Sequence, residues 1–401
     1  MANPPFNVDK VKAESAESAG RLPFGLPSVN KNKEISNGNY LWISYFYSYL
    51  NETGRAGFVM ASSSTDSQGK DKDIREKLVR TGHVDVMISV GNNFFYTRSL
   101  PCSLWFFDKG KKEEIKDKVL FIDARNYYTV VDRTLNEWNE YQLENLSAIV
   151  ALYRGDNNKY YHLVDHYEHL LHVYITHIKE KGLLYTANYL LENTRWTISQ
   201  KENQSQFSSI CDSLKNDIEN LHWYDLIKDT QQLEHLKTLK QSVNKFENLA
   251  MLATKYNDFE GSYYHYSYDD EIEIPYPQPY HSKASKKASF TAMLKNDCLV
   301  AHRELDSIIS VLEAYFWLTE KFSDGQYNDI AGLCKIATID EIESKEFSLT
   351  PGAYVGVAPM EDDGVDFNKR MAEIHEQLQL LQAESNQLMQ TISRNWEELN
   401  I

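Results

Sequence analysis

Two apolar runs decide the fold, Ala56-Gly57-Phe58-Val59-Met60-Ala61 and Val84-Asp85-Val86-Met87-Ile88-Ser89-Val90, with the charged stretch Lys70–Arg80 between them. Both runs are short and rich in residues that favour strands. The stretch between them carries Ile74 and Leu78 at helical spacing and has aspartates near its start, as a crossover helix does. The sequence therefore predicts an α/β fold in which these runs belong to one sheet.

The pattern changes further along the chain. Two more β-rich runs, 102–108 and 119–123, extend the α/β pattern to about residue 125. From about 140 to 260 the apolar residues recur every three or four positions, which indicates amphipathic helices. Residues 261–290 hold a Tyr-rich run, an acidic patch and several prolines, so we expect an irregular connection there.

The end of the chain, 366–400, carries a heptad pattern. Its apolar residues recur three and four positions apart, at Met371, Ile374, Leu378, Leu381, Leu388, Ile392 and Leu399. This spacing is typical of a coiled-coil helix. We therefore expect three regions: 1–155 with the sheet, a helical region 156–325, and a tail 326–401 that ends in the heptad helix.

The charge of the chain limits how it can bind nucleic acid. The formal net charge is −16. General affinity for phosphates needs clustered Lys and Arg, so a chain this acidic does not hold nucleic acid by overall electrostatics. Any DNA contact is expected to be local or assisted by a partner.

The cysteines and the apolar stretches indicate where the protein works. Cys102, Cys211, Cys298 and Cys334 lie far apart and form no Cys-x-x-Cys pair, so we expect reduced thiols in the cytoplasm. The most apolar early stretch, 40–50, is well short of the ~20 residues that a membrane-spanning helix requires. The start of the chain lacks the basic and apolar segments of a signal peptide.

A four-residue motif near the amino terminus carries the chemistry. Asn3-Pro4-Pro5-Phe6 resembles the Asn/Asp/Ser-Pro-Pro-aromatic loop of methyltransferases that act on amino nitrogens in adenine, cytosine or the glutamine amide. The lone pair of such a nitrogen is delocalised, so the enzyme has to offer acceptors that favour a tetrahedral nitrogen. The resemblance implies that Asn3 and the Pro4 carbonyl are these acceptors. It also implies that Pro5 stiffens the loop and that Phe6 stacks on a flipped base.

The segments that follow resemble one family in particular, the modification subunits of type I restriction-modification systems, which are adenine-specific DNA methyltransferases. In chain order these segments are 54–60, 74–78, 88–90, 93–102, 332–342 and 348–356. The resemblance implies a partial class I methyltransferase sheet, which is Rossmann-like, then a helical region and a coiled-coil-like helix. Residues 1–155 would be the carboxyl-terminal half of the catalytic domain.

The same resemblance implies further site residues and partners. One of Phe94, Phe95 and Tyr96 would help to wall the pocket for the flipped base. The subunit would methylate DNA with S-adenosylmethionine as the donor, beside a restriction subunit and a specificity subunit that reads the site. The tail 326–401 would contact the specificity subunit. The family commonly has Arg where this chain has Ala353, so a phosphate or partner contact is expected to be missing.

The donor-binding elements of the family have no counterpart in this sequence. Class I methyltransferases bind the donor through a Gly-rich loop and an acidic residue that both precede the Pro-Pro loop, whereas only two residues precede Asn3. The glycines of 54–57 stand before a strand, the wrong side for a cofactor loop. We therefore expect no cofactor-binding residue in this chain. We also expect an unpaired edge at the strand 56–61, and thus poor solubility or oligomerisation of the chain alone.

Three other clusters of residues have competing interpretations. His162, His166 and His169 share one face of a His-rich helix, 162–177, where a metal site competes with ordinary packing. A zinc-protease pattern would need His where the chain has Asp165, so packing is favoured and no metal is expected. The basic clusters 70–80 and 283–295 are candidates for phosphate contacts, with solvated charge as the favoured interpretation.

Three functions remain open from the sequence. The first is the adenine-specific DNA methyltransferase subunit, inactive alone because its donor-binding half is absent. The second is a methyltransferase acting on the glutamine amide of a protein, which needs the same two acceptors. The third is an interaction module that binds a specificity subunit through its helical tail without methylating anything.

Overall fold

The computed structural model of the chain describes residues 1–96, 98–180, 201–255 and 286–358, with scattered positions between 183 and 191 and between 370 and 392. The chain divides into two compact units, Met1–Gly356 and Val357–Ile401. All strands named below belong to the first unit.

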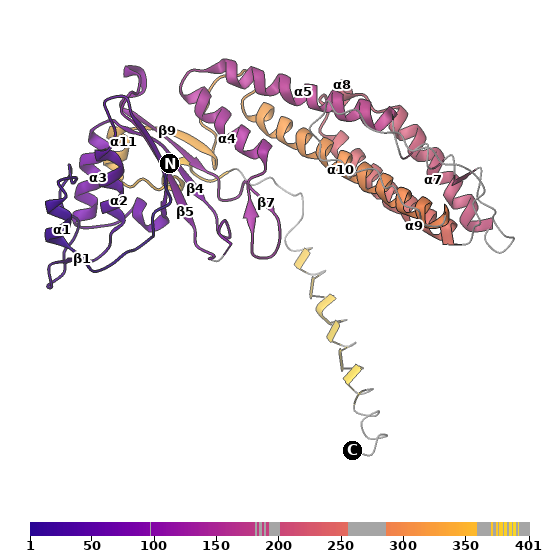
Figure 1. Ribbon diagram of the computed structural model, residues 1–401, viewed down its shortest axis with the longest axis horizontal. Coiled ribbons are helices and arrows are strands. Elements are labelled where there is room, and N and C mark those ends of the chain that lie inside the picture. Colours follow the sequence, from indigo (N-terminus) through magenta and orange to yellow (C-terminus); the bar gives the residue numbers. More distant parts are fainter. Residues whose placement is uncertain are drawn as a thin grey trace. The chain divides into compact units, whose positions relative to one another are not determined.

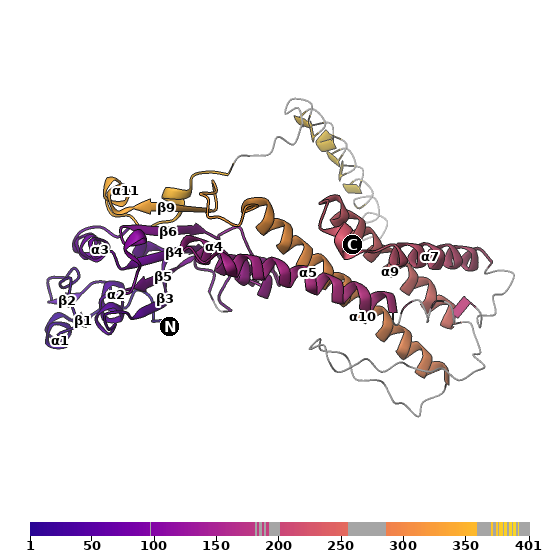
Figure 2. The same cartoon turned by 90° about the horizontal axis from the view of Figure 1, so that it is seen from above.

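The first unit contains a five-stranded mixed sheet (Figure 1, Figure 2). The strands run in the order β3-β5-β4-β6-β9 across the sheet. Their bounds are β3 (Arg55–Ala61), β4 (Val84–Val90), β5 (Cys102–Asp108), β6 (Lys118–Asp123) and β9 (Cys334–Thr338). The apolar runs of the first 125 residues are all strands of this sheet, so the α/β prediction is confirmed.

The strand directions follow from the connections. β3 and β4 each pair antiparallel with β5, which lies between them, so β3 and β4 run parallel to each other. The helix α3 (Lys70–Arg80) connects them, as predicted for a crossover. β4 also pairs parallel with β6, and β9 pairs antiparallel with β6. The sequence pattern does not predict β9, because it is five residues long and mixes Lys335 and Thr338 with apolar residues.

Helices cover one face of the sheet and bury its aromatic side chains. The helices are α2 (Asn39–Ser48), α3, α11 (Ile339–Ser344) and α12 (Gly352–Val355). They pack with strand residues that include Phe58, Met87, Trp105 and Phe121. Trp105 is fully buried and Tyr354 of α12 stacks on Phe121 at 3.9 Å. Segments from both ends of the unit therefore share this core.

The other face of the sheet packs on the helical region. α4 (Glu140–Tyr153) begins with a capping box between Asn139 and Gln142, and its Leu146 and Ile149 bury Val86 and Ile122. The helices that follow are α5 (Asn157–Glu180), α7 (Lys201–Glu219), α8 (Trp223–Leu226), α9 (Gln231–Lys255) and α10 (Lys286–Lys321). Figure 1 and Figure 2 show α10 beside both α5 and α9, and their buried residues form one continuous cluster with the sheet.

Several short elements complete the first unit. β1 (Val11–Lys12) and β2 (Glu34–Ile35) pair around α1 (Ala13–Ser18). β7 (Thr129–Val130) and β8 (Asn136–Glu137) form a hairpin. Single turns of 3-10 helix are η1 (Ser62–Thr65) and η2 (Glu113–Ile115). Among the described residues, no helix is both long and apolar enough to cross a membrane.

Two sequence predictions fall partly outside the described residues. Positions 256–285 are not described, and α10 begins at Lys286, so the last five residues of the predicted connection 261–290 are helical. In the second unit, the described positions between 370 and 392 are helical. Their apolar side chains Met371, Ile374, Leu378, Leu381, Leu388 and Ile392 are exposed. The coiled-coil pairing of 366–400 and the three-region division of the chain stay predictions.

Candidate active site

The loop Asn3-Pro4-Pro5-Phe6 begins beside the first strand of the sheet. Ala2 forms a parallel bridge with Phe58 of β3. The Ala2 amide donates to the Gly57 carbonyl at 3.1 Å, and the Val59 amide donates to the Ala2 carbonyl at 3.1 Å. The chain therefore enters the loop in the direction of β3, along the edge of the sheet that β5 does not occupy.

Asparagines hold the other end of this loop. The Asn7 amide donates to Asn39 Oδ1 at 2.9 Å, and Asn39 Nδ2 donates back to Asn7 Oδ1 at 2.9 Å. Asn37 Nδ2 also donates to Asn7 Oδ1, at 3.0 Å, and the Gly38 amide donates to the Val8 carbonyl at 2.7 Å. Asn7 has a φ of 54°, a left-handed conformation that asparagine tolerates better than most residues. The start of α2 thus fixes the loop.

The four loop residues differ in exposure. Pro4 is buried, Phe6 is half-buried, and Asn3 and Pro5 are exposed. Within the described part of the chain, the Asn3 side chain has no hydrogen-bond partner, so its carbonyl oxygen is available to a ligand. This arrangement supplies a rigid loop with an open acceptor, as the sequence motif requires.

The structure separates the three aromatic residues that the sequence proposed for a base pocket. Phe95 meets Phe6 edge-on, with ring centroids 6.1 Å apart. Phe94 packs inwards on Trp138 at 5.1 Å and on Tyr128 at 6.0 Å. Tyr96 is 88% exposed. Of the three, Phe95 is therefore the one that lies against the candidate catalytic loop.

The hairpin β7–β8 anchors the aromatic loop. The Asn136 amide donates to the Asn93 carbonyl at 2.7 Å, and Asn136 Nδ2 donates to the Asn92 carbonyl at 3.0 Å. Asn93 has a φ of 66°, so the chain turns sharply as it leaves β4. Phe95 and Arg98 then form an antiparallel bridge.

The segment 348–356 lies beyond the carboxyl ends of β3 and β6. The Leu349 amide donates to the Thr65 carbonyl at 2.8 Å, and the Thr350 hydroxyl lies 2.7 Å from that of Thr65. Gly352 approaches Arg125, which makes a bidentate pair with Asp123. Hydrogen bonding to Asp123 raises the pKa of Arg125. Ala353, where the family commonly has Arg, is exposed.

The hydrogen bonds between Asn7 and the side chains of Asn37 and Asn39 are a feature that sequence reasoning missed. Its signal in the sequence is the turn Asn37-Gly38-Asn39 before a Tyr-rich helix, a pattern that favours the start of a helix. The spacing alone does not reveal that Asn39 pairs with Asn7, 32 residues earlier.

Both interpretations of the basic cluster 70–80, solvated charge and a phosphate contact, are wrong for Arg75. Its side chain is fully buried and donates to the Phe347 carbonyl at 2.6 Å. Lys72 pairs with Glu346 at 2.9 Å and Arg80 pairs with Glu343 at 2.7 Å. These cations attach the segment 343–347 to α3 instead. In the second basic cluster, 283–295, residues 283–285 lie outside the described residues.

Glycines near β3 do not form a donor-binding loop. A Cβ atom on Gly57 would lie 3.0 Å from the Phe106 ring, and one on Gly54 would lie 2.9 Å from Asn51 Oδ1. The protein's own side chains occupy the space beside both glycines, so no cofactor can approach the backbone there. These two glycines therefore do not form a site for S-adenosylmethionine.

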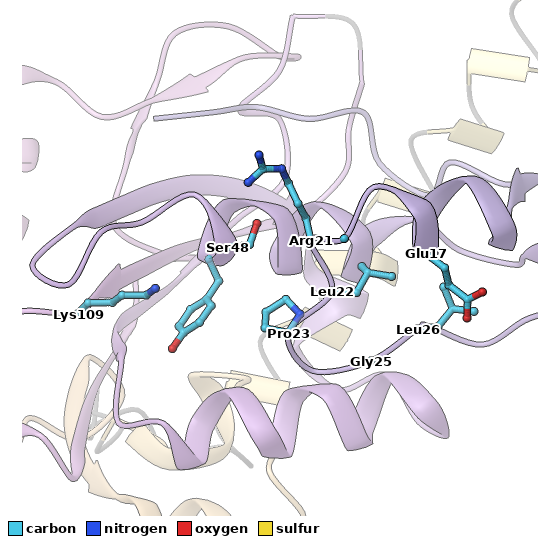
Figure 3. A pocket seen from close by; sticks show the side chains of 10 residues that line it. Glu17, Arg21, Leu22, Pro23, Gly25, Leu26, Ser48 and Lys109 are labelled. Atoms are coloured by element: carbon cyan, nitrogen blue, oxygen red, sulfur yellow. The ribbon is translucent and has the colours of Figure 1, made fainter.

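Two cavities lie away from the Pro-Pro loop. One, of about 570 Å³, is lined by Arg21, Tyr47 and Lys109 among others (Figure 3). Lys109 directly follows β5, at the opposite end of that strand from the aromatic loop. The other cavity, of about 870 Å³, lies between the sheet residues Leu104 and Phe106 and the helices α4 and α5. Neither cavity is lined by a residue of the candidate catalytic loop.

The described residues contain no group of three or more His, Cys, Asp or Glu side chains placed to hold a metal. His162, His166 and His169 of α5 are exposed, whereas His177 is buried beside Glu304 of α10. All four cysteines are buried and free, and burial raises the pKa of Cys102 to about 11 and that of Cys334 to about 11. The thiols are thus suited to packing.

Comparison with known proteins shows what the first part of the chain is similar to. Residues 1–173 match the model of the N-6 DNA Methylase family. This match includes the Pro-Pro loop, β3 to β8 and α4. The resemblance predicted from the sequence is therefore confirmed over these residues.

The individual relatives are methylase subunits of type I restriction enzymes. The chain is 34% identical over 160 residues to the MjaIX methylase subunit of Methanocaldococcus jannaschii, which covers 38% of this chain and 27% of that protein. It is 30% identical over 139 residues to the HindI methylase subunit of Haemophilus influenzae, covering 34% and 30%. The chain thus spans less than a third of the length of these relatives.

A solved structure belongs to the same group. It is the type I restriction-modification system methyltransferase subunit from Streptococcus thermophilus, with 21% identity, a TM-score of 0.33, and coverage of 37% of this chain and 30% of that one.

Proposed function

We propose that this chain is part of an adenine-specific DNA methyltransferase, the modification subunit of a type I restriction-modification system. The observation that carries the proposal is the Asn3-Pro4-Pro5-Phe6 loop, held between the Ala2–Phe58 bridge and the Asn7–Asn39 pair, with Phe95 against Phe6. The match of residues 1–173 to the N-6 DNA Methylase family supports it. DNA is favoured over a glutamine amide because the relatives are restriction-enzyme subunits.

In this proposal the loop acts on the amino group of an adenine flipped out of the duplex. Asn3 Oδ1 and the Pro4 carbonyl accept the two amino hydrogens, which favours a tetrahedral nitrogen whose lone pair is free to attack. Phe6 stacks on the base, and Phe95, edge-on to Phe6, closes one side of the pocket. Orientation of the base by this rigid loop supplies much of the rate.

The methyl donor of this reaction would be S-adenosylmethionine, which supplies an electrophilic methyl group. The glycines of 54–57 offer it no cradle, so we assign its site to protein outside this chain. The carboxyl-terminal region 326–401 would bind the specificity subunit, and a restriction subunit would join the complex in the cytoplasm. Because the net charge is −16, specific DNA contact would depend on these partners.

The test is methylation by a complex restored with donor-binding and specificity parts. Asn3→Ala should lower the methylation rate by on the order of 10²–10³-fold while the complex still assembles, because it removes one preorganised acceptor. Asn32→Ala, on an exposed turn, is the matched control and should keep full activity. Unchanged methylation by Asn3→Ala would contradict the assignment.

Titration of the 401-residue chain with S-adenosylmethionine tests where the donor binds. Calorimetry carried to millimolar donor should give no saturable heat from the folded chain. Saturating heat would place a donor site in this chain, contrary to the proposal.

A second candidate function is an interaction module that binds a specificity subunit without catalysis. The exposed apolar side chains at described positions between 371 and 392 favour it, since exposed apolar stripes at heptad spacing are contact surfaces. Deleting 366–401 should abolish co-purification with the specificity subunit. Unchanged co-purification would remove the tail from that interface.

A further inference from the structure

The aromatic loop after β4 presents three rings to three different surroundings. Phe94 is packed on Trp138 and Tyr128, and Phe95 lies against Phe6. Tyr96 is 88% exposed and makes no ring contact with other described residues. The first two rings are occupied by the protein, whereas the third faces solvent.

Hydrogen bonds anchor the part of the loop that leads to Tyr96. Asn136, itself 9% exposed, donates to the carbonyls of both Asn92 and Asn93. Phe95, the residue before Tyr96, forms an antiparallel bridge with Arg98. The backbone on the amino-terminal side of Tyr96 is thus anchored, which lowers the entropy lost when this loop contacts another molecule.

An exposed cation lies two residues further along the chain. Arg98 is exposed and has no carboxylate partner among the described residues. On a chain whose net charge is −16, an exposed guanidinium two residues from a solvent-facing ring favours a local anionic partner. The pairing of an aromatic ring with a cation is typical of contacts to unstacked bases and their phosphates.

We propose that Tyr96 inserts into the DNA duplex at the position that the flipped adenine leaves, with Arg98 on an adjacent phosphate. This inference rests on the proposed function and gives neighbouring rings different roles. Phe95 and Phe6 hold the extruded base, and Tyr96 stacks on the bases that remain. Inserted side chains offset the loss of stacking when a base leaves the helix.

This role differs from that of a pocket wall in a measurable way. A wedge contributes to extrusion, so it matters when the adenine is paired and matters little when the adenine is already unpaired. A pocket wall contacts the extruded base itself, so its loss impairs both substrates. Two duplexes discriminate these roles, one with a normal A·T target and one with the same adenine opposite an abasic site.

The experiment measures methylation of both duplexes by the restored complex carrying wild-type chain, Tyr96→Ala or Tyr96→Phe. We expect Tyr96→Ala to slow methylation of the paired target by on the order of tenfold or more, because the loss of one base–aromatic stacking contact has an effect of this size. Methylation of the unpaired target should stay within about twofold of wild type, and Tyr96→Phe should behave as wild type on both duplexes. Tyr224→Ala is the matched control, because Tyr224 is 57% exposed on α8.

Each other outcome overturns a specific statement. Equal decreases in the methylation rate on both duplexes would make Tyr96 part of the base pocket. An unchanged rate on both would show that Tyr96 does not contribute to methylation. Either result contradicts the wedge and leaves the proposed function intact. If the wild-type complex methylates neither duplex while DNA binding persists, the proposed function itself fails, and the wedge fails with it.

Discussion

The Nε atom of Arg75 donates a 2.6 Å hydrogen bond to the carbonyl oxygen of Phe347, 272 residues further along the chain. Nη1 of the same guanidinium donates to the Tyr40 hydroxyl at 3.0 Å and to the Ser67 carbonyl at 2.8 Å. One fully buried side chain thus joins α2, α3 and the segment that follows α11. The sheet and the late segment 343–356 are therefore one folded structure.

Arg75→Met should destabilise this unit strongly. The Met side chain fills similar space but donates no hydrogen bond, and each buried acceptor left unpaired costs about 1–3 kcal/mol. Urea unfolding of wild type and variant gives the difference in the free energy of unfolding. Lys70→Met is the matched control on the same helix, and its effect should be much smaller because Lys70 is exposed. Equal effects would show that Arg75 does not join the segments.

Asn39→Ala should act on the candidate catalytic loop without touching substrate. Asn39 is 3% exposed, and both hydrogen bonds of its side-chain amide go to Asn7. Their loss frees the end of the Pro-Pro loop, and a displacement of about 1 Å costs on the order of 100-fold in rate. We expect the methylation kcat of the restored complex to fall while KM for DNA changes little.

Two controls separate this positioning role from general destabilisation. Asn39→Asp keeps the acceptor for the Asn7 amide but loses the donor to Asn7 Oδ1, so its kcat should lie between those of wild type and Asn39→Ala. A thermal melt of each variant reports whether the fold persists. If kcat followed the melting temperature alone, Asn39 would be a structural residue only.

Four strands of the sheet could be predicted from the sequence because each is a short, mostly apolar run. Val84–Val90 and Cys102–Asp108 are strands over the bounds that the runs indicate. The strand β9 could not be predicted in the same way. Its register is set by pairing with β6, where Lys118 lies opposite Thr338, and a short mixed sequence does not reveal a partner so far away.

The candidate site was predicted as residue types and not as geometry. The motif identifies Asn3 and Phe6, and the sequence proposes three adjacent aromatic residues. Which ring faces Phe6 depends on the left-handed Asn93 and its bond from Asn136, so Phe95 could not be chosen beforehand. The buried state of Arg75 was equally hidden, because a helix of mixed charge predicts solvent exposure.

The buried cysteines should react slowly. Burial raises the pKa of Cys102 and Cys334 to about 11 and that of Cys211 to about 12, so little thiolate exists at pH 8. A chromogenic disulfide reagent at pH 8 should label none of the four thiols rapidly in the folded chain. All four should react after unfolding in urea. Rapid labelling of one thiol in the native protein would contradict its buried position.

The edge of β3 beyond Ala2 should make the chain associate when it is alone. Ala2 occupies one position of this edge, and Arg55 lies further along it with no described strand beside it. Exposed strand edges pair with one another. Sedimentation velocity of the purified chain should show species larger than one copy whose fraction grows with concentration. A single monomeric species across a tenfold concentration range would contradict this prediction.

Lys111 should make stability rise with pH in a defined range. Its Nζ donates to the carbonyls of Val84 at 2.9 Å and Lys118 at 2.5 Å. Burial, opposed by attraction to Asp85 and Asp108, lowers the pKa of Lys111 from 10.5 to about 8. Between these two pH values the unfolded chain binds more protons than the folded chain, so the free energy of unfolding increases with pH.

Lys111→Met removes this titration, so the free energy of unfolding of wild type relative to the variant should increase between pH 8 and 9.5. The increase is at most about 1 kcal/mol per pH unit, since one unit of pKa shift corresponds to about 1.4 kcal/mol before solvent screening. Measurements stop at pH 9.5 because tyrosines ionise above it. Lys112→Met, at the exposed neighbour, should leave the pH dependence of wild type unchanged. Parallel curves for wild type and Lys111→Met would mean that Lys111 keeps its ordinary pKa in the folded chain.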